Sequence, residues 1–76
     1  MKEILETIAK NLVDNPDSVQ VRELDGEEVL TLELKVAPED MGKVIGKQGR
    51  IARAIRTVVK AAAVNESKRV MVEIVQ

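Results

Sequence analysis

The most informative part of the sequence spans residues 44–50 and reads Val44-Ile45-Gly46-Lys47-Gln48-Gly49-Arg50. Two glycines three residues apart permit positive φ angles and leave no side chain above the turn. The backbone N–H groups of such a turn, beside a helix that begins at Arg50, form a natural seat for a phosphate group. Lys47 adds a mobile positive charge at the same point. The stretch therefore predicts a turn between two helices that can hold a phosphate.

Both flanks of this turn have helical character. Pro38 suits the first turn of a short helix, and the helix dipole favours the acidic Glu39 and Asp40 near its start. After the turn, a longer helix is expected from about Arg50 to Val64. One side of it is apolar and is expected to pack inward, with Ile51, Ile55, Val58 and Ala62. The opposite side is basic, with Arg50, Arg53, Arg56 and Lys60.

Hydrophobic spacing predicts the remaining elements. They are a helix over residues 2–14 and strands over residues 19–22, 30–36 and 69–75. Asn15-Pro16 ends the first helix, and Asp25-Gly26 forms the turn between the first two strands. Leu24 is out of phase with Val19 and Val21, which predicts a bulge or a register change near that turn. The order α-β-β-α-α-β indicates one α+β domain over residues 1–76, with helices packed on one face of a three-stranded sheet.

The composition narrows the classes of function. The 76 residues include no Cys and no His, which excludes disulfides, thiolate and imidazole catalysis, and the usual zinc ligand sets. No nucleophile–base pair or paired acidic cluster is evident, so no enzyme, cofactor or metal site is expected. The N-terminus lacks the apolar run of a signal peptide, and no apolar stretch approaches a membrane span. We expect a cytoplasmic protein with neither a membrane nor a small-molecule substrate as its partner.

The net charge of −1 hides an uneven distribution. Residues 1–40 contain four basic and eleven acidic side chains, a net charge of −7. Residues 41–60 contain six basic side chains and no acidic one, a net charge of +6, and residues 61–76 are balanced. A local basic face matters more for binding a polyanion than the net charge of the whole chain. The central segment therefore predicts a nucleic-acid partner.

The motif and the order of elements together resemble KH domains. Residues 44–50 are similar to the V-I-G-x-x-G signature of these domains, and α-β-β-α-α-β resembles their prokaryotic, type II arrangement over nearly the whole chain. The continuation of the motif through Ile51 and Ala52 into an Arg- and Ala-rich helix is most similar to the small bacterial stand-alone KH proteins, the KhpA family. KH domains clamp about four nucleotides of backbone with a glycine loop. Modules that stack bases on aromatic side chains are disfavoured, because this chain has no Phe, Tyr or Trp.

This resemblance implies an RNA-binding protein, an RNA chaperone or post-transcriptional regulator that clamps single-stranded RNA. Members of the family are associated with a larger, Jag-like KH-domain protein and are linked to cell-envelope homeostasis, which includes cell shape and peptidoglycan. A homodimer, or a heterodimer with such a partner, is therefore expected. The residues expected to contact RNA are Lys43, Val44, Ile45, Gly46, Lys47, Gln48, Gly49, Arg50, Arg53 and Arg56.

The sequence departs from the KH pattern at one position. Many KH domains carry a bulky aliphatic residue three positions after the second glycine, where this chain has Ala52. The smaller side chain implies a shallower apolar floor beneath the bases. Strong base selectivity is therefore not expected from this domain alone.

Other functions compete with this interpretation. A P-loop is excluded because three residues separate Gly42 from Gly46 instead of four, and Gln48 replaces the magnesium-binding Ser or Thr. A helix-turn-helix module that binds duplex DNA remains open, although Ile51 and Ala52 offer no hydrogen bonds to base edges at the start of its recognition helix. A protein-interaction domain, in which surfaces of opposite charge drive dimerisation, also remains open.

Overall fold

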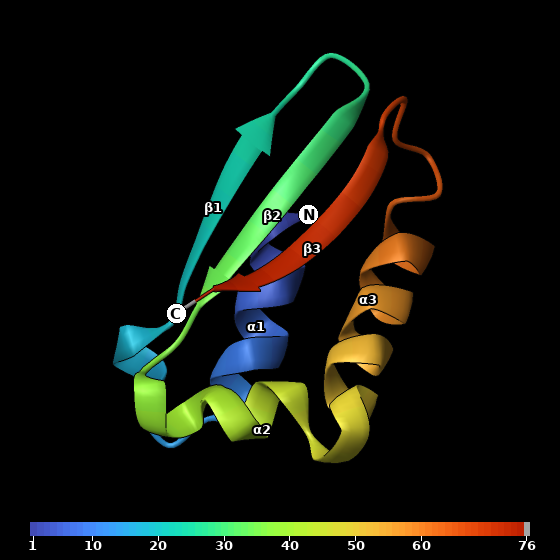
Figure 1. Cartoon of the computed structure of the whole chain (residues 1–76). Coiled ribbons are helices and arrows are strands. Elements are labelled where there is room, and N and C mark those ends of the chain that lie inside the picture. Colours follow the sequence, from blue (N-terminus) through green and yellow to red (C-terminus); the bar gives the residue numbers. More distant parts are fainter. Residues whose placement is uncertain (76) are drawn as a thin grey trace.

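The computed structural model describes residues 1–75 and contains three helices and three strands (Figure 1). The helices are α1 (Lys2–Leu12), α2 (Met41–Ile45) and α3 (Arg50–Ala62), and the strands are β1 (Gln20–Asp25), β2 (Val29–Lys35) and β3 (Arg69–Val75). Single 3-10 turns at Pro16–Ser18, Pro38–Asp40 and Lys47–Gly49 join them. The predicted order of elements is confirmed. The first and last helices end two residues earlier than expected.

The strands form one sheet in the order β1-β2-β3. β1 pairs with β2 in antiparallel fashion from Gln20↔Lys35 to Asp25↔Leu30. β2 pairs in parallel with β3 from Val29↔Arg69 to Lys35↔Val75. The pairing of β1 is continuous, so the expected bulge near Leu24 is wrong. Val19 precedes the strand, and Leu24, paired with Thr31, is 39% exposed.

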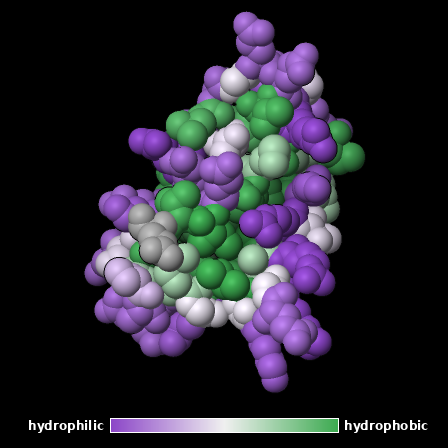
Figure 2. Space-filling view, in the orientation of Figure 1, coloured by the Kyte–Doolittle hydropathy of each residue, from purple (hydrophilic) through white to green (hydrophobic). Residues whose placement is uncertain are grey.

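All three helices lie on one side of the sheet, as predicted, and the other face is open (Figure 1). Alternate residues of the strands point toward the helices, because side chains of a strand alternate between its two faces. The core formed in this way is aliphatic and includes Leu5 and Ala9 of α1, Val21, Leu32, Leu34, Val70 and Val72 of the sheet, Val44 of α2, and Ile55 and Val59 of α3. Figure 2 shows hydrophobic residues over the open face of the sheet with hydrophilic residues around them.

The buried face of α3 differs from the predicted one. Its buried residues are Ala52, Ile55 and Val59, whereas Val58 is 48% exposed and Ala62 is exposed. The expectation that Val58 lies in the core is therefore wrong. Aliphatic residues cover a broad side of this helix, wider than the strip that the sheet buries. Spacing alone therefore cannot decide which of them the sheet will cover.

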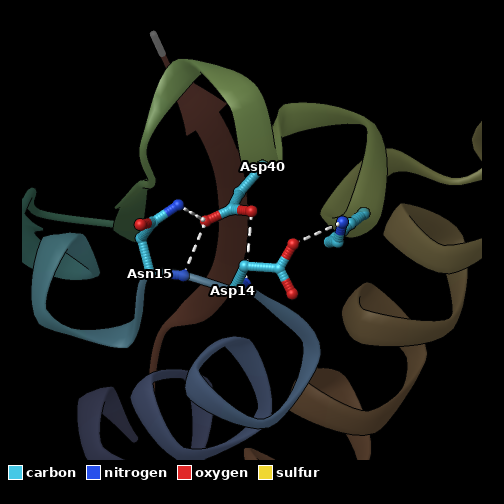
Figure 3. A network of polar contacts seen from close by, with 4 residues as sticks. Asp14, Asn15 and Asp40 are labelled. Atoms are coloured by element: carbon cyan, nitrogen blue, oxygen red, sulfur yellow. Dashed lines mark hydrogen bonds and ion pairs between the residues drawn. The ribbon is translucent and has the colours of Figure 1, made fainter.

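A buried carboxylate joins the end of α1 to the start of α2 (Figure 3). Asp40 is 1% exposed and makes no capping hydrogen bond to α2. Its two carboxylate oxygens instead accept hydrogen bonds from the backbone N–H groups of Asp14 (3.2 Å) and Asn15 (3.0 Å) and from the side-chain amide of Asn15 (3.0 Å). We call these three residues the Asp40 network. A buried acceptor with all these donors in place stabilises the junction that holds α2.

The Asp40 network changes the acidity of its carboxyl group. Burial disfavours the charged form, but the hydrogen bonds from Asn15 and Asp14 and the charge of Lys43 outweigh it and lower the pKa of Asp40 below its ordinary 3.8. A carboxylate with a lowered pKa stabilises the folded state above the unfolded pKa. This contribution is lost as the pH falls through the folded pKa.

We therefore expect Asp40→Asn to lower the free energy of unfolding at neutral pH, because the new amide places a donor against the donors of Asn15. The difference from the unmodified protein should be constant above about pH 5 and shrink below pH 3.8. Denaturant titrations at a series of pH values measure it. Asp17→Asn, at an exposed aspartate outside the network, is the control. A difference that grew with acidification would contradict this role.

Candidate nucleic-acid interface

The loop between α2 and α3 has a backbone conformation that glycine makes accessible. Gly46 has φ 74° and ψ 172°, and Gly49 has φ 73° and ψ 15°. Gln48 between them also has a positive φ of 58°. The N–H of Gly46 donates to the carbonyl of Gly42 (2.8 Å) and closes α2, and the N–H of Gly49 donates to the carbonyl of Gly46 (3.1 Å). The loop is thus a compact turn that leads directly into α3.

The two glycines are required for different reasons. A Cβ atom on Gly46 would lie 2.6 Å from Cγ1 of Ile51, so this position is closed by the first turn of α3. A Cβ atom on Gly49 would meet nothing within 4 Å. Gly46 therefore permits the contact between the loop and α3, whereas Gly49 leaves the outer side of the loop uncovered.

Alanine substitution should separate these two roles. We expect Gly46→Ala to lower the free energy of unfolding by about 2–3 kcal/mol, because it combines a steric clash with a φ/ψ region that is essentially restricted to glycine. Gly49→Ala should cost about 1 kcal/mol, the strain of a left-handed residue alone. Denaturant unfolding of both variants measures this difference. Equal losses would show that Ile51 does not constrain the loop.

The outer side of the loop gathers groups that attract anions. Lys47, Gln48 and Arg50 are exposed. α3 begins at Arg50, and no side chain caps its N-terminus. The first N–H groups of a helix without a cap carry partial positive charge and have no intrahelical acceptors. The loop therefore brings the positive end of α3 together with two basic side chains.

A basic stripe continues from the loop along α3. We define it as Arg50, Arg53, Arg56 and Lys60, which are all exposed. Within residues 1–75, none of the four side chains forms an ion pair, whereas Lys43, Lys68 and Arg22 pair with Asp14, Asp25 and Glu33. A guanidinium N–H of Arg53 donates to the carbonyl of Gln48 (3.4 Å). The positive charges of the stripe are thus left for an external anion.

A small depression lies between the basic stripe and the edge strand β3. It has a volume of about 100 Å³ and is lined by Arg56, Lys60, Arg69, Val70, Met71 and Val72. The Nε–H of Arg56 donates to the carbonyl of Val72 (3.4 Å), so this backbone group of β3 faces α3. A wider depression of about 670 Å³, which Arg22, Glu33 and Lys35 help to line, includes no residue of the loop or α3.

The structure brings together most of the residues predicted for the site. The four loop residues lead directly into α3, which carries the three exposed arginines, and Ile45, 37% exposed, lies directly before the loop. Val44 is fully buried in the core, so the expectation that its side chain contacts a ligand is wrong. Lys43 lies apart from the stripe, since its ammonium group forms an ion pair with Asp14 (3.0 Å). The hydrogen bond and the charge of Asp14 raise the pKa of Lys43.

Residues of β3 were absent from the predicted site. Arg69 and Met71 line the depression beside α3, together with Lys60, which the sequence had placed only in the stripe. The positive charge of Arg69 is a signal in the sequence that indicates it as a candidate for the site. Its position beside Arg56, however, depends on the parallel pairing of β3 with β2. Pairing between segments so distant in sequence is not encoded in local spacing.

The type II arrangement of elements, with a glycine loop joining α2 to α3, defines a KH domain. Residues 2–74 match the family described as "KhpA/KhpB, KH domain", and the chain belongs to this family. It is similar to "RNA-binding protein KhpA" of Clostridium acetobutylicum, with 76% identity over 99% of this chain and 100% of the relative. The protein of the same name from Aquifex aeolicus is 53% identical over 100% of this chain and 96% of the relative. Membership in this family agrees with the prediction that the protein is not an enzyme.

Two solved structures support the fold. The chain resembles part of Aquifex aeolicus Era Y63A bound to GDP.AlF4-, with a TM-score of 0.71 and 20% identity, over 96% of this chain and 28% of Era. It also resembles part of Era in complex with MgGDPNP and nucleotides 1506–1542 of 16S ribosomal RNA, with a TM-score of 0.64 over 97% of this chain and 30% of that one. The chain thus spans less than a third of Era. Within residues 1–75, no helix has the length and apolarity needed to cross a membrane.

Proposed function

We propose that this chain binds single-stranded RNA as a single KH domain. The observation that carries the proposal is the uncovered glycine loop at the N-terminus of α3, which leads into a basic stripe that has no acidic partner within residues 1–75. The RNA backbone lies against the N–H groups near Gly49 and follows α3 past Arg50, Arg53 and Arg56. The names of the relatives as RNA-binding proteins support this function.

The absence of aromatic side chains agrees with this mode of binding. Recognition through stacking needs Phe, Tyr or Trp on the surface, whereas a glycine loop binds the sugar–phosphate backbone through main-chain N–H groups and charge. Ile45, exposed beside the loop, supplies an apolar contact for a base. The RNA-binding residues are Ile45, Gly46, Lys47, Gln48, Gly49, Arg50, Arg53 and Arg56.

A biological role is suggested by membership in the family described as "KhpA/KhpB, KH domain". We propose an RNA chaperone or post-transcriptional regulator in the cytoplasm, with an effect on cell shape and peptidoglycan. It acts as a homodimer or with a larger, Jag-like KH-domain protein, because a second RNA-binding unit raises affinity through effective concentration. Aliphatic side chains left exposed, such as Val58 at 48% and Met71 at 45%, support association with another chain.

Binding to the loop can be tested by reversing its charge. Lys47→Asp with Gln48→Asp should abolish binding of single-stranded RNA and leave the fold intact, because both side chains are exposed. For the unmodified protein, log Kd against log salt should have a slope of about 3 in magnitude if about four phosphates are neutralised. Fluorescence anisotropy with a labelled oligonucleotide measures both quantities.

The matched control places the same change of charge on α1. Lys10→Glu with Asn11→Glu alters two exposed residues outside the loop and the stripe and should leave the affinity within about two-fold, as expected for distant charges in physiological salt. RNA binding that survived the loop variant would show that the glycine loop is not the site. Equal or tighter binding of duplex DNA of the same length would overturn the proposal in favour of a helix-turn-helix function.

The ion pair of Lys43 generates a separate test. Lys47→Ala should reduce the salt slope by about 0.7, the share of one phosphate contact on a single strand. Lys43→Ala should leave the slope unchanged, because Asp14 already holds that ammonium group. The slopes come from anisotropy titrations at several salt concentrations. A loss with Lys43→Ala as large as that with Lys47→Ala would mean that RNA displaces Asp14.

A further inference from the structure

We infer that Arg56 is a specificity-determining residue that reads a guanine base in the depression between α3 and β3. This inference rests on the proposed RNA binding and adds a base preference to it. Arg56 is distinguished from the other arginines of the basic stripe by its partner. Its Nε–H donates to the carbonyl of Val72 on the edge strand β3 (3.4 Å). Arg53 instead donates to the loop carbonyl of Gln48.

The contact with Val72 holds the guanidinium group of Arg56 in the depression. With Nε bonded to β3, the two terminal nitrogens remain as a planar pair of donors. Within residues 1–75, no carboxylate forms an ion pair with Arg56. A guanidinium group that is already oriented loses less conformational freedom when it binds a ligand. Its free edge therefore suits an acceptor pair that lies in one plane.

The other polar groups around the depression favour the same kind of ligand. Its charged side chains, Arg56, Lys60 and Arg69, are hydrogen-bond donors without acceptor capacity. One lone pair of the Val72 carbonyl is engaged by Arg56. The charged side chains of the depression therefore favour a base edge with acceptors over one that presents an amino group.

Guanine meets this requirement best among the four bases. Its O6 and N7 atoms are adjacent acceptors, and bidentate contact with arginine is the commonest specific contact to this base. Adenine presents the N6 amino group in place of O6 and so opposes a donor to a donor. Cytosine has an acceptor pair of its own, O2 and N3, on the Watson–Crick edge that a single strand leaves free, but the N4 amino group lies directly beside it. Uracil offers acceptors but not the adjacent O6 and N7 pair. The order of preference is guanine, then cytosine, then uracil, then adenine.

This mode of reading does not depend on an apolar floor. Ala52 is 5% exposed and belongs to the buried face of α3, so it offers little surface to a base. Selectivity comes instead from hydrogen bonds at the β3 side of the helix. The weak base selectivity expected from the sequence rested on the small side chain of Ala52 alone and took no account of hydrogen bonds from Arg56.

The test compares four RNA heptamers, UUUGUUU, UUUAUUU, UUUCUUU and UUUUUUU, in anisotropy titrations with the unmodified protein. The guanine oligonucleotide should bind about ten-fold more tightly than the adenine one, the range expected for one bidentate contact. Inosine, which keeps O6 and N7, should replace guanine without loss. 7-Deazaguanine, which lacks N7, should lose most of the preference.

Two variants separate base reading from phosphate binding. Arg56→Lys keeps the charge but removes the planar pair of donors, so the ratio of the affinities for UUUGUUU and UUUAUUU should fall from about ten to about one, whatever the change in overall affinity. Arg53→Lys is the matched control on the same helix and should retain the guanine preference. Circular dichroism and thermal unfolding confirm that both variants are folded.

The outcomes separate this inference from the proposed RNA binding. If all four heptamers bind equally, the inference is overturned while RNA binding stands. If none binds at low salt, the RNA-binding proposal itself fails. An equal loss for every heptamer with Arg56→Lys would make Arg56 a phosphate contact. A guanine preference that survived this substitution would place base reading elsewhere.

Discussion

The close approach of Gly46 to Ile51 is the constraint on which the site depends. A side chain at position 46 would occupy the space that the first turn of α3 fills, 2.6 Å from Cγ1 of Ile51. Because that side chain is absent, α2 and α3 meet through a loop of only a few residues. The N-terminus of α3 then opens onto the loop, and the rest of the helix lies beside β3 (Figure 1). The position of the uncapped N-terminus of α3 directly after the loop therefore depends on this one contact.

Charge is distributed so that, within residues 1–75, no acidic side chain forms an ion pair with the basic stripe. Acidic residues of the first half of the chain form ion pairs with basic residues outside the stripe, as in Asp14 with Lys43 and Glu33 with Arg22. The buried carboxylate of Asp40 accepts hydrogen bonds from the backbone N–H groups of Asp14 and Asn15. The net charge near zero therefore describes a molecule with separate acidic and basic regions, and the basic region contains the glycine loop.

The proposed mode of RNA binding needs no aromatic residue. In that proposal, main-chain N–H groups and arginines supply the attraction, and the hydrogen bond from Arg56 to the backbone carbonyl of Val72 orients one of those arginines. Backbone contacts hold a ligand without regard to sequence, whereas an oriented guanidinium group can distinguish bases. Both kinds of contact lie along one side of α3. A domain of 76 residues thus has room for a clamp and for one reading position.

The sequence by itself determined the order of the elements, the glycine loop and the basic stripe, because these follow from local spacing and from glycine's access to positive φ. The tertiary structure alone decided which aliphatic face of α3 is buried, so that Val59 lies in the core and Val58 is exposed. The tertiary structure also decided that Lys43 forms an ion pair with Asp14 and that Arg69 lines the same depression as Arg56. Each of these outcomes depends on contacts between segments far apart in the chain, and the periodicity of a single segment carries no information about its neighbours.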